Sequence, residues 1–279
     1  MNISTCHRRS RTPLALLAAG GVAAALMATS AAPASADPRT TSHAKPTVVL
    51  VHGAFADSSG WNGVVKKLKH EGYPVVAAAN PLRGLSSDSA YLKDVLAGIK
   101  GPVVLAGHSY GGAVISNAAT GNKNVKALVY VAAFVPEKGE SALDLAARFP
   151  GSTLGQALHP VPVTNPDGSR GADLYIQEGK FGGQFAADVS RGTAELMAVA
   201  QRPVTEAALA EKSSEPAWKT IPTWDLVATQ DLNIPPKAQA FMAERAGAHT
   251  VEVKASHAVH VSRPDKVTEI IVDAARTVR

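Results

Sequence analysis

Residues 102–112 read PVVLAGHSYGG, and this stretch decides the fold more than any other part of the chain. Its first half, PVVLA, is a short apolar run, typical of a strand that is buried on both faces of a parallel sheet. Its second half, GHSYGG, contains glycines that favour a tight turn, and it begins a segment of small residues that is compatible with a helix. The stretch therefore predicts a strand, a tight turn and a helix, with Ser109 at the turn.

Apolar runs alternate with helical patterns on both sides of this stretch. The helical segments repeat apolar residues at spacings of three and four, which predicts helices packed on a sheet. Repeated strand–helix units with apolar strands predict an α/β fold built on a doubly wound, mostly parallel sheet. We expect strands over residues 47–51, 74–79, 102–106, 125–133, 222–228 and 250–253, and helices over residues 61–68, 92–99, 110–120 and 236–246 and from Pro264 onward.

The alternation stops between about residues 137 and 220. Residues 141–149 favour a helix, and residues 184–212 favour helical pieces. Between them, Asn165-Pro166-Asp167-Gly168 has turn chemistry and separates two short extended runs, which predicts a hairpin. An insertion of about 80 residues is too long for a loop. We therefore predict an inserted, mainly helical cap over one sheet edge, within a single domain spanning residues 47–279.

Residues 1–36 have the features of an export signal. Three arginines precede an apolar stretch of about 14 residues, and Ala34-Ser35-Ala36 matches a signal-peptidase cleavage site. The apolar stretch is shorter than the roughly 20 residues that a membrane-spanning helix needs. We predict cleavage after Ala36 and secretion by the Sec or the twin-arginine route, with residues 37–46 as a linker.

Charge and cysteine content narrow the classes of function. The chain has 28 basic and 23 acidic side chains, and three of the basic ones and none of the acidic ones lie in residues 1–36. The remainder therefore has 25 basic and 23 acidic side chains, a net charge of +2. This balance predicts no nucleic-acid partner and, after removal of the leader, no membrane partner. The single cysteine, Cys6, also lies in the leader, which excludes cysteine nucleophiles and cysteine metal sites from the remainder.

The pentapeptide Gly107-His108-Ser109-Tyr110-Gly111 matches the pattern G-x-S-x-G. The pattern is weak alone, but between a strand and a helix it is typical of a turn that exposes a nucleophilic serine. Such a serine needs a basic histidine that a carboxylate orients, with the acid and then the histidine on loops after later strands. Asp231 and His257 occupy these two positions. We therefore predict a catalytic triad of Ser109, His257 and Asp231.

Other residues compete for the acid and the base. Asp225 lies inside a predicted strand, and we interpret it as structural, whereas Glu137 and Glu140 follow the strand at 125–133 and remain alternatives for the acid. His260 lies three residues beyond His257 and is expected to pack or to cap the final helix. The two histidines lack a third ligand nearby, so we predict no metal site. His108 is expected to pack or to form a hydrogen bond.

Acyl transfer also needs hydrogen-bond donors for the developing oxyanion. One is the backbone N–H of Tyr110, the residue after the nucleophile. The second is expected from the loop after the first strand, where the Ala54 N–H is the first candidate and the Phe55 N–H the second. The Phe55 ring is expected to line the substrate pocket, and His52 to hold this loop in place.

With VHGAF at residues 51–55, GHSYGG at 107–112, Asp231 and ASHAVH at 255–260, the chain resembles the α/β-hydrolase superfamily. Within it, the chain is similar to the small esterases grouped with plant methylesterases and hydroxynitrile lyases. The resemblance spans residues 47–279 and implies a cofactor-free serine hydrolase. Ala258 stands where the hydroxynitrile lyases carry a lysine, which counts against cyanohydrin cleavage. The dehalogenases and epoxide hydrolases of the superfamily use an aspartate as the nucleophile, so a serine at position 109 argues against these two activities.

We therefore expect a secreted carboxylic-ester hydrolase that acts on small to medium, partly apolar esters through an acyl-enzyme intermediate. Two other classes of function stay open. The same triad serves cofactor-free haloperoxidases, which carry out perhydrolysis, and enzymes that cleave carbon–carbon bonds. A non-catalytic binding protein on the same fold is the third hypothesis. The oligomeric state is not predicted.

Overall fold

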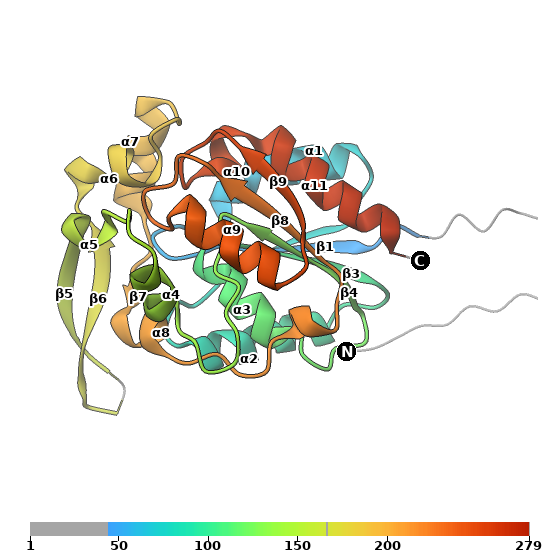
Figure 1. Ribbon diagram of the computed structural model, residues 1–279, viewed down its shortest axis with the longest axis horizontal. Helices are drawn as coiled ribbons and strands as arrows, with labels where there is room; N and C mark the ends of the chain where they lie inside the picture. Colours follow the sequence, from blue (N-terminus) through green and yellow to red (C-terminus); the bar gives the residue numbers. More distant parts are fainter. Residues whose placement is uncertain (1–43, 166, 279) are drawn as a thin grey trace, which may run out of the picture. The chain divides into compact units, whose positions relative to one another are not determined.

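Six apolar runs form one parallel sheet in the computed structural model, which describes residues 44–165 and 167–278 (Figure 1). Because helices cover both faces, the inner strands carry mostly Val, Leu and Ala, whereas the edge strand at residues 249–253 reads HTVEV and is largely exposed. This architecture confirms the predicted α/β fold. In spatial order the strands are β2 (Val75–Ala78), β1 (Thr47–Val51), β3 (Val103–His108), β4 (Val125–Val131), β8 (Thr223–Ala228) and β9 (His249–Val253).

In the central strands β1, β3 and β4, successive side chains point into two separate apolar cores. In β1, Val48 and Leu50 pack in the core under α1 and α11, whereas Val49 and Val51 pack in the core under α2, α3 and α9. The sheet is therefore doubly wound, with a helical layer on each face. The helices are α1 (Asn62–His70), α10 (Val259–Ser262) and α11 (Pro264–Thr277) on one face, and α2 (Leu85–Ala97), α3 (Tyr110–Ala118) and α9 (Pro236–Arg245) on the other.

The segment between β4 and β8 forms a cap of helices with a small antiparallel sheet. Its strands β5 (Leu158–Thr164) and β6 (Arg170–Ile176) pair as the predicted hairpin, and the two-residue strand β7 (Val204–Thr205) adds to β6. The cap helices are α4 (Ala142–Arg148), α5 (Leu154–Ala157), α6 (Glu178–Phe185), α7 (Arg191–Ala200) and α8 (Glu206–Ala210).

Helix α6 of the cap is bonded to the loops that follow two strands of the large sheet. The Gln184 side chain donates to the carbonyl of Leu232, in the loop after β8, at 2.9 Å. The carbonyl of Phe185 accepts from the N–H of Ala258, in the loop after β9, at 2.9 Å. These two loops carry the predicted acid and base, so the cap contacts the predicted site directly.

The predicted export signal, its cleavage site and most of the linker fall on residues 1–43, which lie outside the described residues. Within residues 44–165 and 167–278, no helix is long and apolar enough to cross a membrane.

Candidate active site

Ser109 lies in the turn between β3 and α3, and its backbone is strained. Its φ of 55° and ψ of −126° are unusual for a residue with a side chain. The turn is closely packed: a Cβ added to Gly107 would lie only 2.6 Å from the carbonyl oxygen of Gly111. A Cβ on Gly111 would lie equally close to the carbonyl oxygen of Val51. The glycines of the motif therefore let the turn pack against β1, with Ser109 at the carboxyl end of the sheet.

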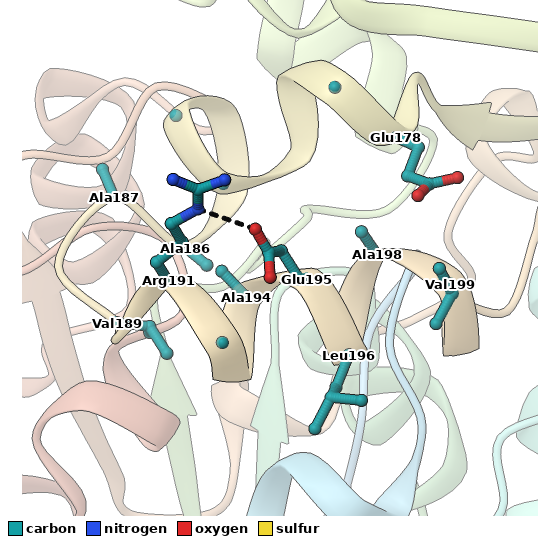
Figure 2. A pocket seen from close by; sticks show the side chains of 14 residues that line it. Glu178, Ala186, Ala187, Val189, Arg191, Ala194, Glu195, Leu196, Ala198 and Val199 are labelled. Atoms are coloured by element: carbon teal, nitrogen blue, oxygen red, sulfur yellow. Dashed lines mark hydrogen bonds and ion pairs between the residues drawn. The ribbon is translucent and has the colours of Figure 1, made fainter.

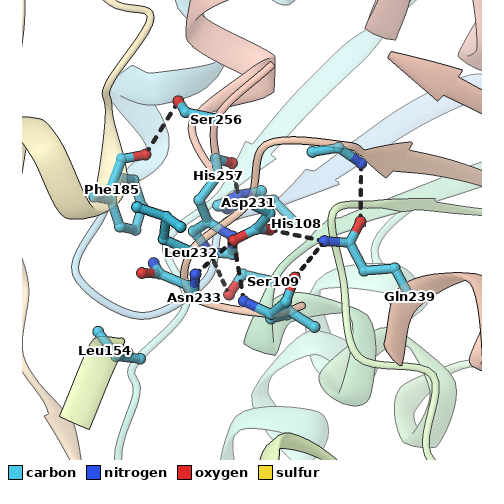
Figure 3. Close-up of polar contacts among 12 residues, drawn as sticks. His108, Ser109, Leu154, Phe185, Asp231, Leu232, Asn233, Gln239, Ser256 and His257 are labelled. Carbon is cyan, nitrogen blue, oxygen red and sulfur yellow. Dashed lines mark hydrogen bonds and ion pairs between the residues drawn. The ribbon is translucent and has the colours of Figure 1, made fainter. Parts of the chain in front are cut away.

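The structure brings Ser109, His257 and Asp231 together from three separate loops (Figure 3). The Nδ1 atom of His257 lies 2.7 Å from Oδ2 of Asp231, and its Nε2 atom lies 2.9 Å from Oγ of Ser109. The carboxylate can only accept, so Nδ1 carries the proton and Nε2 is free to accept the serine hydroxyl. All three side chains are buried. This is the geometry of a serine activated by an oriented base.

The Asp231 carboxylate is held by three donors besides His257. Its Oδ1 atom accepts from the backbone N–H groups of Asn233 at 2.7 Å and Ile234 at 3.0 Å. Its Oδ2 atom also accepts from Nε2 of Gln239 at 2.8 Å. Four hydrogen bonds therefore fix the orientation of the carboxylate toward the imidazole.

The sequence analysis missed Gln239 as a residue of the site. Its orientation is fixed at both ends, because Oε1 accepts from the Ala228 N–H at 2.9 Å while Nε2 donates to Asp231. Its signal in the sequence is a polar residue on the buried face of α9, between Ala238 and Met242. A fully buried glutamine in such a place needs hydrogen-bond partners, and the nearby acid is one of them.

The loop after β1 packs against the nucleophile turn. A Cβ on Gly53 would lie 2.6 Å from Cβ of Ser109 and 3.1 Å from the nitrogen of Tyr110. The Phe55 N–H donates to the carbonyl of Arg202 at 3.0 Å, so this second candidate for the oxyanion donor is already in use. The Ala54 N–H donates to no acceptor among the residues that the structure describes. Ala54 and Tyr110 thus remain the two predicted donors.

Two further features of this loop agree with the sequence analysis. His52 holds the loop, because its Nε2 accepts from the Asn80 N–H and its Nδ1 therefore donates to the Gly53 carbonyl, each at 2.9 Å. The Phe55 ring lines the cavity beside Ser109. The backbone of Phe55 is also strained, with a φ of 62°, and this residue lies next to the predicted oxyanion donor Ala54.

The carboxylates that compete with Asp231 for the role of the acid have other surroundings. Glu137 forms an ion pair with Lys219, and Glu140 pairs with Arg245 through both carboxylate oxygens. Asp225 is buried inside β8, and neither of its oxygens has a hydrogen-bond partner in residues 44–165 and 167–278. None of the three carboxylates bonds to His257, which Asp231 holds.

Two more histidines, His108 and His260, are buried close to His257. His108 donates from Nε2 to the backbone carbonyl of His257 at 2.9 Å, and its ring lies against that of His260, tilted by 40° with 4.0 Å between ring centroids. Burial, followed by the neighbouring imidazoles, holds the pKa of His108 well below its usual value. Burial also lowers the pKa of His260, to about 3. Both rings are therefore neutral near pH 7, and His108 positions the loop that carries His257.

A small cavity of about 60 Å³ opens beside the nucleophile. It has room for roughly two water molecules, so it suits a short substituent rather than a long chain. The residues that line it are mostly apolar: Ala54, Phe55, Ser109, Tyr110, Phe134, Ala142, Leu143, Ala146, Ser152, Leu154, Leu209, Asn233, Ile234 and His257.

A larger cavity of about 860 Å³ lies between α6 and α7 of the cap (Figure 2). Small side chains and glycines line much of it, and the ion pair of Arg191 with Glu195 lies along α7 on one of its walls. None of the triad residues borders this cavity, so we place the chemistry at the smaller one.

Comparisons with known proteins agree with this geometry. The chain is 26% identical over 262 residues to Alpha/beta hydrolase nvfD of Aspergillus novofumigatus, covering 83% of this chain and 97% of that relative. It is 34% identical over 110 residues to the Carbendazim hydrolyzing esterase of a Nocardioides species, covering 35% of this chain and 46% of that esterase.

Solved structures share the fold at lower identity. The structure of polyneuridine aldehyde esterase superposes with a TM-score of 0.71 at 23% identity, covering 82% of this chain and 98% of the esterase. The sequence profile described as "Alpha/beta hydrolase family" matches residues 48–270, which include the nucleophile turn, Asp231 and His257. The chain therefore belongs to the alpha/beta hydrolase family.

Proposed function

We propose that the protein is a serine esterase that cleaves small, partly apolar carboxylic esters through an acyl-enzyme intermediate. One observation carries this proposal, the continuous chain of hydrogen bonds from Ser109 through His257 to Asp231 at 2.9 and 2.7 Å. The two relatives that are named hydrolase and esterase support it.

The geometry suits a two-step reaction. His257 takes the proton of the Ser109 hydroxyl while its oxygen attacks the ester carbonyl, and the N–H groups of Ala54 and Tyr110 stabilise the oxyanion. The alcohol then leaves with the proton from His257, and Ser109 holds the acyl group. A water molecule, deprotonated by His257, attacks the acyl carbonyl and releases the acid. Asp231 stabilises the imidazolium in both steps.

The cavity supports a preference for short substrates. Its volume of about 60 Å³ is far below the 300–1,000 Å³ or so of sites that enclose drug-sized ligands. Phe55, Phe134, Leu154 and Leu209 contribute apolar walls. We therefore expect acetyl, propionyl and butyryl esters to be cleaved faster than esters of long-chain acids.

The proposal is tested with p-nitrophenyl acetate and a fluorophosphonate probe that labels activated serines. We expect the wild-type protein to hydrolyse the ester and to be labelled, and Ser109→Ala to lose the labelling and at least 10³-fold in kcat. Ser87→Ala, which removes an exposed serine of α2, is the matched control and keeps both activities. Hydrolysis by Ser109→Ala at the wild-type rate would falsify the serine mechanism.

We also propose that the protein is exported and cleaved after Ala36. The basic start, the apolar stretch and the Ala34-Ser35-Ala36 site support this. Expression of the full chain in an exporting host should place protein in the medium with Asp37 as its first residue by N-terminal sequencing. Accumulation of full-length protein in the cells alone would contradict it.

A further inference from the structure

Asn233 places a polar side chain in the wall of the cavity beside Ser109. It lies in the loop between β8 and α9, where its backbone N–H already holds Asp231 at 2.7 Å. Its side chain is only 3% exposed and borders the same cavity as Ser109 and His257. The side chain is therefore available for a role separate from that of the backbone.

A chain of hydrogen bonds fixes which way the Asn233 amide points. The carbonyl of Leu232 can only accept, so the Gln184 atom that lies 2.9 Å away is the nitrogen Nε2. The same nitrogen lies 2.7 Å from the Asn233 amide and donates to it, so the Asn233 atom that faces Gln184 is the oxygen Oδ1 (Figure 3 shows Asn233 and Leu232 beside the triad). The hydroxyl of Thr153 completes the chain by donating to Oε1 of Gln184 at 2.8 Å.

The Asn233 NH₂ group is therefore the end of the amide that is not bonded to Gln184. It is buried and donates to no acceptor among residues 44–165 and 167–278. Leaving a buried donor without a partner costs about 1–3 kcal/mol, so such a group on a residue that lines the cavity points to a ligand. Ser109 and His257 are engaged in the proposed reaction itself, which leaves Asn233 and Ser152 as polar residues of the lining that could recognise another part of the substrate.

We propose that the Asn233 NH₂ group determines specificity by donating a hydrogen bond to a second oxygen of the substrate. The preferred substrates are then short esters with an ether, keto or hydroxyl oxygen within a few bonds of the scissile carbonyl. No lysine or arginine borders the cavity, so the oxygen it accommodates is uncharged rather than a carboxylate. This inference rests on the proposed ester hydrolysis at Ser109.

Two esters of equal size test the proposal: p-nitrophenyl butyrate and p-nitrophenyl methoxyacetate, which differ by one CH₂ replaced by oxygen. The quantity measured is the ratio of kcat/KM for methoxyacetate to kcat/KM for butyrate. Comparing this ratio between variants cancels the different intrinsic reactivities of the esters. We expect Asn233→Leu to lower the ratio about 10-fold relative to the wild type, the effect of one lost hydrogen bond to the substrate.

Gln184→Leu is the matched control, because it breaks the same contact between Asn233 and α6 while keeping the NH₂ group. The proposal expects its ratio to stay within about twofold of the wild-type ratio. An equal fall in Asn233→Leu and Gln184→Leu would assign the effect to the cap contact and overturn the proposal. A fall in Ser152→Ala without one in Asn233→Leu would assign the donor to Ser152 and would also overturn it.

Failure of this inference and failure of the proposed function give different results. If the wild-type protein hydrolyses both esters and is labelled by the fluorophosphonate, but Asn233→Leu leaves the ratio unchanged, only the role of Asn233 is wrong. If the wild-type protein hydrolyses neither ester and is not labelled, the proposed function is wrong and the inference falls with it.

Discussion

Asp225 and Asp231 are six residues apart and both are buried, yet their surroundings are opposite. The Asp231 carboxylate, in the loop after β8, accepts four hydrogen bonds. The Asp225 carboxyl, in the middle of β8, accepts none from the described residues, and burial raises its pKa well above the usual 3.8. In mid-strand the backbone N–H groups are used by the sheet, whereas beyond the strand end they are free to hold a side chain.

The largest effect is expected from replacing each aspartate by its amide and measuring kcat for p-nitrophenyl acetate. Asp231→Asn should lower kcat about 10⁴-fold, because the amide NH₂ can donate to Nδ1 of His257 and so favour the tautomer whose Nε2 is protonated and cannot take the proton of Ser109. Asp225→Asn, its matched control, should stay within about twofold of the wild type. Comparable losses in both variants would mean that the contrast in hydrogen bonding has no bearing on catalysis.

A stability measurement tests whether the buried Asp225 carboxyl, which has no hydrogen-bond partner among the described residues, destabilises the protein as pH rises. A carboxyl with a raised pKa in the folded state is fully stabilising only below its ordinary pKa near 3.8, and stability is lost as pH rises toward the shifted value. Asp225→Val should therefore raise the free energy of unfolding at pH 8 by about 3 kcal/mol, and by less at pH 5. Urea unfolding at the two pH values checks this, and a gain that does not depend on pH would contradict a titrating Asp225.

His260 is the basic counterpart of Asp225, since it is buried and neither ring nitrogen has a partner among the described residues. Its pKa is lowered to about 3, so its contribution to stability is present above 6.5 and is lost as pH falls toward 3. Lowering the pH from 7.5 to 5 should therefore reduce the free energy of unfolding of the wild type by about 2 kcal/mol through His260.

His260→Leu should remove that loss, as measured by urea unfolding at the two pH values. Leucine is chosen because a Cβ on Gly60 would lie only 2.8 Å from the His260 ring, which leaves no space for a larger side chain. An unchanged acid dependence in this variant would place the acid sensitivity elsewhere, with His108 the next residue to replace.

The smallest effect concerns the donors that distinguish Asp231 from Asp225. Gln239→Leu removes one of the four hydrogen bonds and should lower kcat about 10-fold with KM unchanged, because the carboxylate loses part of its orientation. Steady-state kinetics with p-nitrophenyl acetate separate the two constants, and Gln156→Leu, which replaces an exposed glutamine of α5, is the control. A rise in KM with kcat unchanged would instead assign Gln239 to substrate binding.

The sheet, and the meeting of Ser109, His257 and Asp231 at its carboxyl end, could be predicted because their signals are local. The run PVVLA, the glycines around Ser109 and the positions of Asp231 and His257 after apolar strands need no knowledge of distant contacts. The bonds that Gln184 and Gln239 make could not be predicted, since they depend on how α6 and α9 pack on the loop after β8. The two-residue strand β7 gave no pattern, because it exists only through its pairing with β6.

The attachment of α6 to both loops has a consequence for engineering this enzyme. Cap exchange between relatives is a direct route to new substrates, but here a foreign cap would remove the Gln184 bond to the Leu232 loop and the Phe185 bond to Ala258. A transplant should therefore keep the native α6 with its two junctions, and also Arg202 after α7, whose carbonyl accepts from the Phe55 N–H. Directed evolution of substrate range would best begin in the hairpin and α7, which make neither of the two bonds that join α6 to the loops of Asp231 and His257.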